Sequence, residues 1–156
     1  MERMNQGTDL RGLIGYQIQR AHLVMGADAR AALAPFDLSP AKFTALLLIR
    51  DNPGCDQTAL GRALSVNRSS AMKLVNILEE RGLVERRAGR DLRTNALFLL
   101  PEGEVQIGAM IEAVHQSDAR MTQGLSGEEA EQLLVLLRKI SGEEPISDSE
   151  ADTGIA

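Results

Sequence analysis

The sequence predicts a mainly α-helical protein with one small β-hairpin, in the element order ααααββαα. Apolar residues recur at intervals of three and four over several long stretches, which is the pattern of helices with one buried face. The 156 residues include only three Phe, one Tyr and no Trp. A core built from Leu, Ile, Val, Met and Ala suits helices better than β-sandwiches. A chain of this length is expected to form one domain.

Two helices are expected in the N-terminal third. An apolar stripe predicts a long first helix over residues 9–34, which Pro35 ends. Ser39 is expected to cap a second helix that has Pro40 at its first position and that continues to the helix-breaking residues 51–54.

Two shorter helices with a tight link between them follow. Asp56 is expected to cap a helix that ends near Ala63, and Asn67 to cap a helix of about four turns that stops at Gly82. The second of these helices is amphipathic. One face is apolar and predicted to be buried, and it comprises Ala71, Leu74, Val75 and Leu78. The opposite face and its flanks are predicted to be exposed, and they comprise Arg68, Ser69, Ser70, Met72, Lys73 and Asn76.

Two β-prone runs, 83–87 and 94–100, are separated by a polar turn at residues 88–93, which predicts a hairpin. Beyond the hairpin, the sequence predicts a long helix over residues 101–125. A capping box, Ser126 with Glu129, then opens a last helix that runs to about residue 140. Residues 141–156 are predicted to form an acidic, disordered tail.

The charge is distributed unevenly along the chain. The net charge is −5, but the tail at 141–156 alone carries five acidic and no basic residues, so the first 140 residues sum to zero. Residues 57–93 hold eight basic and four acidic residues, a local charge of +4. Binding to phosphates depends on such a local field rather than on the net charge of the chain.

The helix that begins after Asn67 and the hairpin together indicate DNA binding. Small hydroxyl and amide groups let a helix enter a major groove, where they and a Lys or Arg contact base edges and phosphates. The hairpin concentrates four arginines, and a slim basic ribbon fits the minor groove. These arginines are Arg86, Arg87, Arg90 and Arg93. A solvated polar helix and a solvated basic face are the competing interpretations of the two parts taken singly.

In this region the sequence resembles the MarR family of regulators, over about residues 10–140. The family pattern Arg-x-x-x-x-Asp-x-Arg, then an apolar strand, then Leu-Thr-x-x-Gly is matched here, except that Leu100, followed by Pro101, stands at the threonine position. The matching residues are Arg86, Asp91, Arg93, Leu97, Leu99 and Gly103. The residue that usually caps the following helix in the family is therefore missing here. The resemblance implies a winged helix-turn-helix domain in a two-fold dimer that is joined by the first and last helices.

The resemblance also implies a function and a set of contacts. A member of this family would bind a palindromic operator, usually as a repressor, and would leave DNA when a small phenolic or acidic aromatic molecule or a conjugate binds. Arg93 would enter the minor groove, Asp91 would hold Arg93 through an ion pair, and Arg90 would be a second contact at the tip. The helix that begins after Asn67 would be the recognition helix, with contacts from Arg68, Ser69, Ser70, Lys73 and Asn76.

The expected domain thus covers residues 9–140, with the DNA-reading part at 56–100 and the dimerisation helices at 9–34 and 101–140. The apolar surface of those outer helices independently favours a homodimer. An anionic aromatic effector calls for a cation and a ring in its pocket. The candidate pocket residues are Tyr16, Arg20, His22, Phe36, Lys42 and Phe43.

Other classes of function have weaker support. Cys55 is expected to lie inert in a loop, with redox sensing as the alternative. No metal site is expected, because His22 and His115 have no further ligands nearby in the sequence. No nucleophile elbow, phosphate-binding glycine loop, HExxH or CxxC motif indicates an enzyme, and no cofactor is expected. A winged-helix module that binds protein instead of DNA is the remaining alternative.

The absence of a signal core or an 18-residue apolar run predicts a cytoplasmic protein with no membrane partner.

Overall fold

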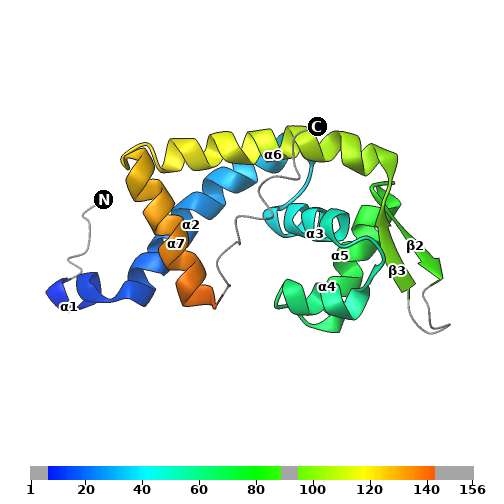
Figure 1. Cartoon of the computed structure of the whole chain (residues 1–156), viewed down its shortest axis with the longest axis horizontal. Coiled ribbons are helices and arrows are strands. Elements are labelled where there is room, and N and C mark those ends of the chain that lie inside the picture. The colour runs from blue at the N-terminus through cyan, green and yellow to red at the C-terminus, as the bar shows by residue number, and fades with distance from the viewer. Residues whose placement is uncertain (1–6, 89–94, 143–156) are drawn as a thin grey trace. The chain divides into compact units, whose positions relative to one another are not determined.

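The computed structural model describes residues 7–88 and 95–142. Within these ranges the chain is mostly helical, with one small three-stranded antiparallel sheet (Figure 1). The chain divides into two compact units, Met1–Asp118 and Ala119–Ala156. The boundary falls near the end of α6 (Pro101–Met121), inside the domain predicted over residues 9–140.

The predicted first helix is two helices. α1 covers Gly7–Gly12 and α2 covers Ile14–Leu33, and Leu13 between them has an extended backbone with φ −83° and ψ 115°. Gly12 and Gly15 flank this break, and glycine lowers helix stability on both sides of it. The expected end at Pro35 is confirmed, because α2 stops at Leu33 and a single 3₁₀ turn, η1 (Ala34–Phe36), follows.

The next three helices begin where the sequence predicts. α3 covers Pro40–Asp51, α4 covers Gln57–Ala63 and α5 covers Arg68–Glu80. The Asp56 carboxylate accepts from the backbone N–H groups of Thr58 and Ala59 at 2.7 and 2.8 Å. The Asn67 side chain accepts from the N–H of Ser70 at 2.8 Å. Ser39 occupies the cap position of α3, but its side chain accepts no hydrogen bond there.

The hairpin is confirmed as β2 (Val84–Ala88) and β3 (Asn95–Leu99), with Arg86 opposite Leu97. A further strand, β1 (Cys55–Asp56), pairs with the other edge of β3, which gives the strand order β1-β3-β2. Cys55 therefore lies in a strand opposite Leu97, and its predicted loop position is wrong. A two-residue strand is too short to show an alternating pattern in the sequence.

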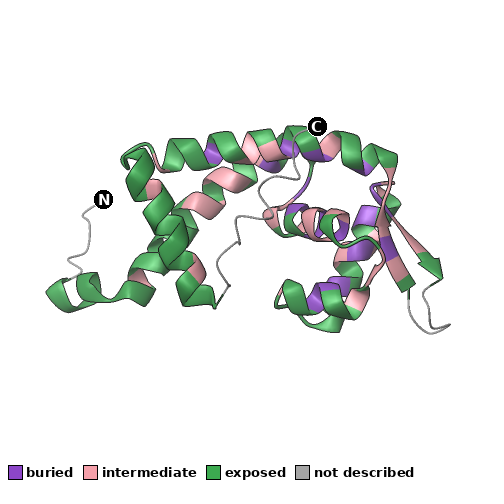
Figure 2. Cartoon of the chain, in the orientation of Figure 1, coloured by how far each residue is buried: buried purple, intermediate pink, exposed green. Residues whose placement is uncertain are grey.

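One hydrophobic core joins α2, α3, α4, α5, the sheet and α6 (Figure 2). It consists of aliphatic side chains with a single aromatic ring, as the composition predicts. Its buried members are Leu33, Leu38, Phe43, Ala45, Leu46, Ile49, Leu60, Val75, Leu78, Leu83, Val84, Leu97, Ile107 and Met110. The Ser117 hydroxyl, buried on α6, donates to the Asp28 carboxylate on α2 at 2.7 Å.

The C-terminal elements follow the prediction with one difference. α6 ends at Met121 rather than at residue 125. α7 covers Gly127–Ser141, and the capping box of Ser126 with Glu129 is present. No residue of α7 is buried in the single chain. Among the described residues no single helix is long and apolar enough to cross a membrane, and one pair bent by 72°, residues 14–36 with 40–51, meets the length and composition criteria only together.

Candidate nucleic-acid interface

Helix α5 presents one polar face to solvent and packs the other against the core. Ala71, Val75 and Leu78 have no exposed surface, and Leu74 is half-buried, which confirms the predicted buried face. The exposed residues of the opposite face and its N-terminal flank are Arg68, Ser69, Ser70, Met72 and Lys73. Two cations and two short hydroxyl side chains therefore lie together on the first part of the helix, with Met72 beside them.

A close approach between α4 and α5 sets the position of that face. Gly61 on α4 is buried, and a Cβ atom built there would lie 3.3 Å from the Cβ of Ala71. The link between the helices is correspondingly tight. The N–H of Val66 donates to the Gly61 carbonyl at 2.9 Å, and Ser65 takes a left-handed conformation with φ 53°. A displacement of α4 would thus be transmitted directly to α5.

The C-terminal end of α5 is held by Arg81, a residue that the sequence analysis did not single out. Its guanidinium donates to the Phe36 carbonyl at 2.8 Å and to the Asp37 carboxylate at 3.1 Å, with a further hydrogen bond to the Asp37 carbonyl. Asp37 follows the 3₁₀ turn in a left-handed conformation, with φ 52°. The fork of donors in a guanidinium suits such a set of neighbouring oxygens.

Arg86 on β2 joins the hairpin to α5. It donates to the Asn76 side-chain oxygen at 2.6 Å and forms an ion pair with Glu79, and 17% of its side-chain surface is exposed. Arg86 and Asn76 were both predicted to contact DNA, and the structure gives each of them a partner within the chain. Sequence reasoning missed Glu79, although its spacing of three from Asn76 places the two on neighbouring positions of one helix face.

Arg87, the next residue of β2, is also held. Its guanidinium lies 4.4 Å from the centre of the Phe98 ring and donates to the Glu85 carboxylate at 2.7 Å. This arrangement packs the side chain along the sheet. Two of the four clustered arginines therefore serve to build the hairpin.

The predicted contacts at the hairpin tip, Arg90, Asp91 and Arg93, lie outside the described residues. The strands on either side remain paired up to Ala88 opposite Asn95.

The candidate effector residues fall into separate groups. Tyr16 and Arg20 are neighbours on α2, with the guanidinium carbon 5.9 Å from the ring centre. Phe43 is part of the core and Phe36 packs against it. The other two candidates, His22 and Lys42, are exposed and half-buried respectively.

The surroundings of Cys55 disfavour the thiolate form of its side chain. Burial, followed by the negative charge of Asp56, raises the pKa of the Cys55 thiol above its usual value. A redox-sensing cysteine requires the opposite shift, because the thiolate is the reactive form. Within residues 7–88 and 95–142, no group of three or more His, Cys, Asp or Glu side chains is arranged to hold a metal ion.

Comparison with known proteins identifies the family. The MarR family profile matches residues 36–94, which include α4, α5 and strand β2 of the hairpin. A putative transcriptional regulatory protein for the hcr operon of Thauera aromatica is 32% identical over 133 residues, which cover 84% of this chain and 80% of that protein. This chain belongs to the MarR family. Members of the family are transcriptional regulators, and this chain is one of them rather than an enzyme.

Solved structures agree with this family assignment. The transcriptional repressor CouR, bound to a 23-mer DNA duplex, has a TM-score of 0.84 and 31% identity, covering 90% of this chain and 99% of CouR. The MarR family protein Rv2887 of Mycobacterium tuberculosis, in complex with salicylic acid, has a TM-score of 0.69 and 25% identity, covering 83% of this chain and 96% of Rv2887. The winged helix-turn-helix fold predicted from the sequence is confirmed.

Proposed function

We propose that this MarR-family regulator is a homodimeric repressor that binds a palindromic operator and leaves it when a small aromatic acid, or a conjugate of one, binds. The observation that carries the proposal is the exposed face of α5, where two hydroxyl side chains and two cations lie opposite a fully packed apolar face. The CouR structure, which contains a DNA duplex, supports the same use of this fold.

The two DNA-reading elements have different roles in this proposal. On α5, Arg68, Ser69, Ser70 and Lys73 face the major groove, where base edges are distinguishable. In the wing, Arg90 and Arg93 face the minor groove, with Asp91 holding Arg93, and there shape and charge dominate. Arg86 and Asn76 connect the two elements, because their hydrogen bond sets the distance between α5 and the hairpin.

Dimerisation follows from the symmetry of a palindrome and from the exposed apolar side chains of the outer helices. Two recognition helices related by a two-fold axis meet successive major grooves about 34–36 Å apart. On α7, Leu134 is 54% exposed and Ile140 is 63% exposed in the single chain. We propose that α1, α2, α6 and α7 supply the interface.

The proposed effector class rests on the Rv2887 complex with salicylic acid and on the cation and ring of Arg20 and Tyr16. Phe36, Lys42, Phe43 and His22 remain candidates for the same pocket. An effector lowers operator affinity if it binds more tightly to a dimer geometry that fits the operator less well. Operator DNA must then weaken effector binding by the same factor. The pKa of the Cys55 thiol, raised by burial and by Asp56, favours an effector of this kind over oxidation as the signal.

The experiment that tests DNA reading starts from a duplex selected out of a random pool by repeated binding to the wild-type protein. A palindromic consensus is expected. Lys73→Ala and Arg93→Ala should each weaken binding and flatten the salt dependence by about one unit of slope per subunit, since each lost phosphate contact contributes about 0.9. Lys139→Ala, which removes the same charge from α7, is the matched control, and light scattering checks that this variant remains a dimer. Failure to enrich any sequence, together with unchanged slopes, would contradict the proposal.

Binding to a scrambled duplex distinguishes the contribution of α5 from that of the wing. Ser69→Leu should abolish the preference for the selected duplex while leaving weak non-specific binding, because a bulky side chain blocks the groove floor but removes no charge. Arg93→Ala should instead weaken binding to both duplexes. Salicylate, added to the wild-type complex, should lower affinity for the selected duplex. A panel of aromatic acids and their thioesters with no such effect would contradict the effector proposal alone.

A further inference from the structure

A cavity of about 220 Å³ lies between the C-terminal end of α3, strand β1 and helix α4. It is separate from the exposed face of α5, and none of the residues that line it was a predicted site for an effector. The lining residues are Leu48, Asn52, Cys55, Ala59, Leu60 and Ala63.

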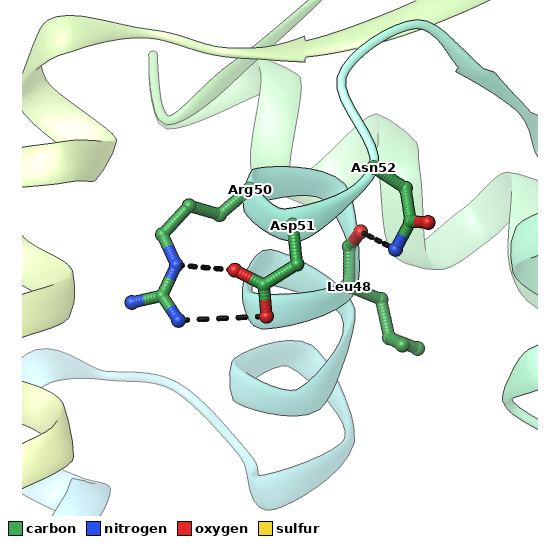
Figure 3. Close-up of polar contacts among 4 residues, drawn as sticks. All are labelled: Leu48, Arg50, Asp51 and Asn52. Carbon is green, nitrogen blue, oxygen red and sulfur yellow. Dashed lines mark hydrogen bonds and ion pairs between the residues drawn. The ribbon is translucent and has the colours of Figure 1, made fainter. Parts of the chain in front are cut away.

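None of these six lining residues, all within the described part of the chain, carries a charged side chain. Its most polar group, the Asn52 amide, is turned back toward α3 and donates to the Leu48 carbonyl at 2.9 Å (Figure 3). The neighbouring charges Arg50 and Asp51 point toward each other and pair at 2.8 Å (Figure 3). An anion placed here would gain no cation from the six lining residues, so the lining does not favour carboxylates.

The electrostatic field at the cavity wall acts in the same direction. Burial and the charge of Asp56 raise the pKa of the Cys55 thiol, so the wall disfavours a negative charge on one of its own side chains. The Asp56 carboxylate is occupied at the N-terminus of α4 by two backbone N–H groups. The remaining wall is formed by Leu and Ala side chains, which offer dispersion contacts to a neutral molecule.

The volume limits the size of the occupant. An apolar cavity of roughly 150 Å³ is large enough to hold benzene. Pockets for drug-sized ligands span about 300–1,000 Å³. A volume of 220 Å³ falls between these limits and suits one aromatic ring with a small substituent.

We propose that this cavity is a binding site for a small, neutral, single-ring molecule, and that its occupancy changes DNA affinity by displacing α4. Ala59 and Ala63 place one side of α4 against the cavity, while Gly61 places the helix against Ala71 of the recognition helix. An occupant that moves α4 therefore moves α5. The binding site stands on the cavity alone, whereas the effect on DNA rests on the proposed function.

The chain provides its own reporter for occupancy. Cys55 is the only cysteine among the 156 residues and lines the cavity, so the rate of its reaction with an aromatic disulfide reagent measures access to the site. Toluene should slow this reaction saturably, with half-protection below about 1 mM, as expected for a small ligand of good efficiency. Benzoate, which has the same ring and a negative charge, should not protect.

Two filled-cavity variants provide the test. Ala59→Leu and Ala63→Leu each place a larger side chain at the cavity and should abolish the protection by toluene, while Ala41→Leu on exposed α3 surface should retain it. Circular dichroism and melting temperature establish that each variant is folded. Absence of protection in the wild-type protein, or equal protection in both filled variants, would overturn the site.

The effect on DNA is measured separately with the duplex selected from a random pool. Toluene should change wild-type affinity by about fivefold or more, the lower end of typical allosteric coupling, and should leave the affinity of Ala59→Leu unchanged. Saturable protection of Cys55 with no change in DNA affinity would retain the site and overturn its coupling to α4. If the wild-type protein selects no duplex at all, the proposed function fails while the protection experiment still decides the site.

Discussion

At the scale of single residues, the planar guanidinium of Arg86 donates hydrogen bonds to two side chains of α5, Asn76 and Glu79. Lysine keeps the charge but lacks the fork of donors that contacts both partners. Arg86→Lys should lower the free energy of unfolding by about 1 kcal/mol and weaken binding to the selected duplex. Denaturant titration and a DNA-binding curve measure the two effects.

Arg50→Lys is the control for this substitution, because Arg50 pairs with the adjacent Asp51 and a lysine retains that pair. It should leave both measurements nearly unchanged. If Arg86→Lys bound DNA as tightly as the wild-type protein, the contact between Arg86 and α5 would not contribute to DNA binding.

The neighbouring pair Cys55 and Asp56 gives a prediction with a definite sign. The carboxylate of Asp56 disfavours the thiolate, so its neutral replacement in Asp56→Asn should lower the pKa of the Cys55 thiol. Asn caps helices as well as Asp does, so α4 should keep its start. The variant should react faster with a disulfide reagent near pH 8, where more thiolate is present. Asp51→Asn should leave the rate unchanged, and a slower reaction of Asp56→Asn would contradict the assignment.

At the scale of elements, Gly103 is the point where α6 leaves the sheet. It is buried, and a Cβ atom there would clash with the Leu83 carbonyl and lie 2.7 Å from a methyl carbon of Leu99. A backbone oxygen cannot turn aside as a side chain can. Gly103→Ala should therefore lower the free energy of unfolding by about 1–3 kcal/mol.

Gly108 on the same helix is the matched control, since a Cβ atom there meets nothing within 4 Å. Gly108→Ala should raise the free energy of unfolding by about 0.5–1 kcal/mol, because alanine is the better helix former. Denaturant titrations at one protein concentration compare the two variants. Equal effects of the same sign would show that the close approach at Gly103 does not constrain α6.

The elements also show what the sequence can and cannot predict. Helix boundaries marked by strong local chemistry, such as the caps at Asp56, Asn67 and Ser126, were predicted and confirmed. The break at Leu13 was missed, because the apolar period runs through it without interruption. Strand β1 was missed because its two residues take an extended conformation only through pairing with β3, which lies far along the chain.

The site shows the same distinction between local and tertiary information. Helical periodicity predicted the buried face of α5, because the period of a helix is a local property. The partners of Arg86 and Arg81 depend on how the hairpin and the 3₁₀ turn pack against α5. A count of arginines cannot distinguish those that build the wing from those that are proposed to contact DNA.

At the scale of the whole molecule, the exposed apolar face of α7 predicts the oligomeric state. The protein should form a dimer of about 34 kDa, twice the 16.9 kDa chain, at micromolar concentration. Leu134→Glu places a charge among apolar side chains and should shift the mass toward that of a monomer. Light scattering measures this shift. Glu131→Gln, on the exposed surface of the same helix, should remain dimeric, and a wild-type monomer would contradict the prediction.

Strand β1 has a consequence for the order in which the molecule opens and folds. The Gly54 N–H donates to the Leu97 carbonyl at 2.8 Å, and Cys55 pairs with the same residue, so this short ladder closes a loop that contains both α4 and α5. A closure between such distant residues forms late and breaks together with the segment that it encloses. In hydrogen–deuterium exchange, the amide of Gly54 should therefore exchange as slowly as the amide of Val75 inside the recognition helix. The two helices and the wing would then unfold as one cooperative unit.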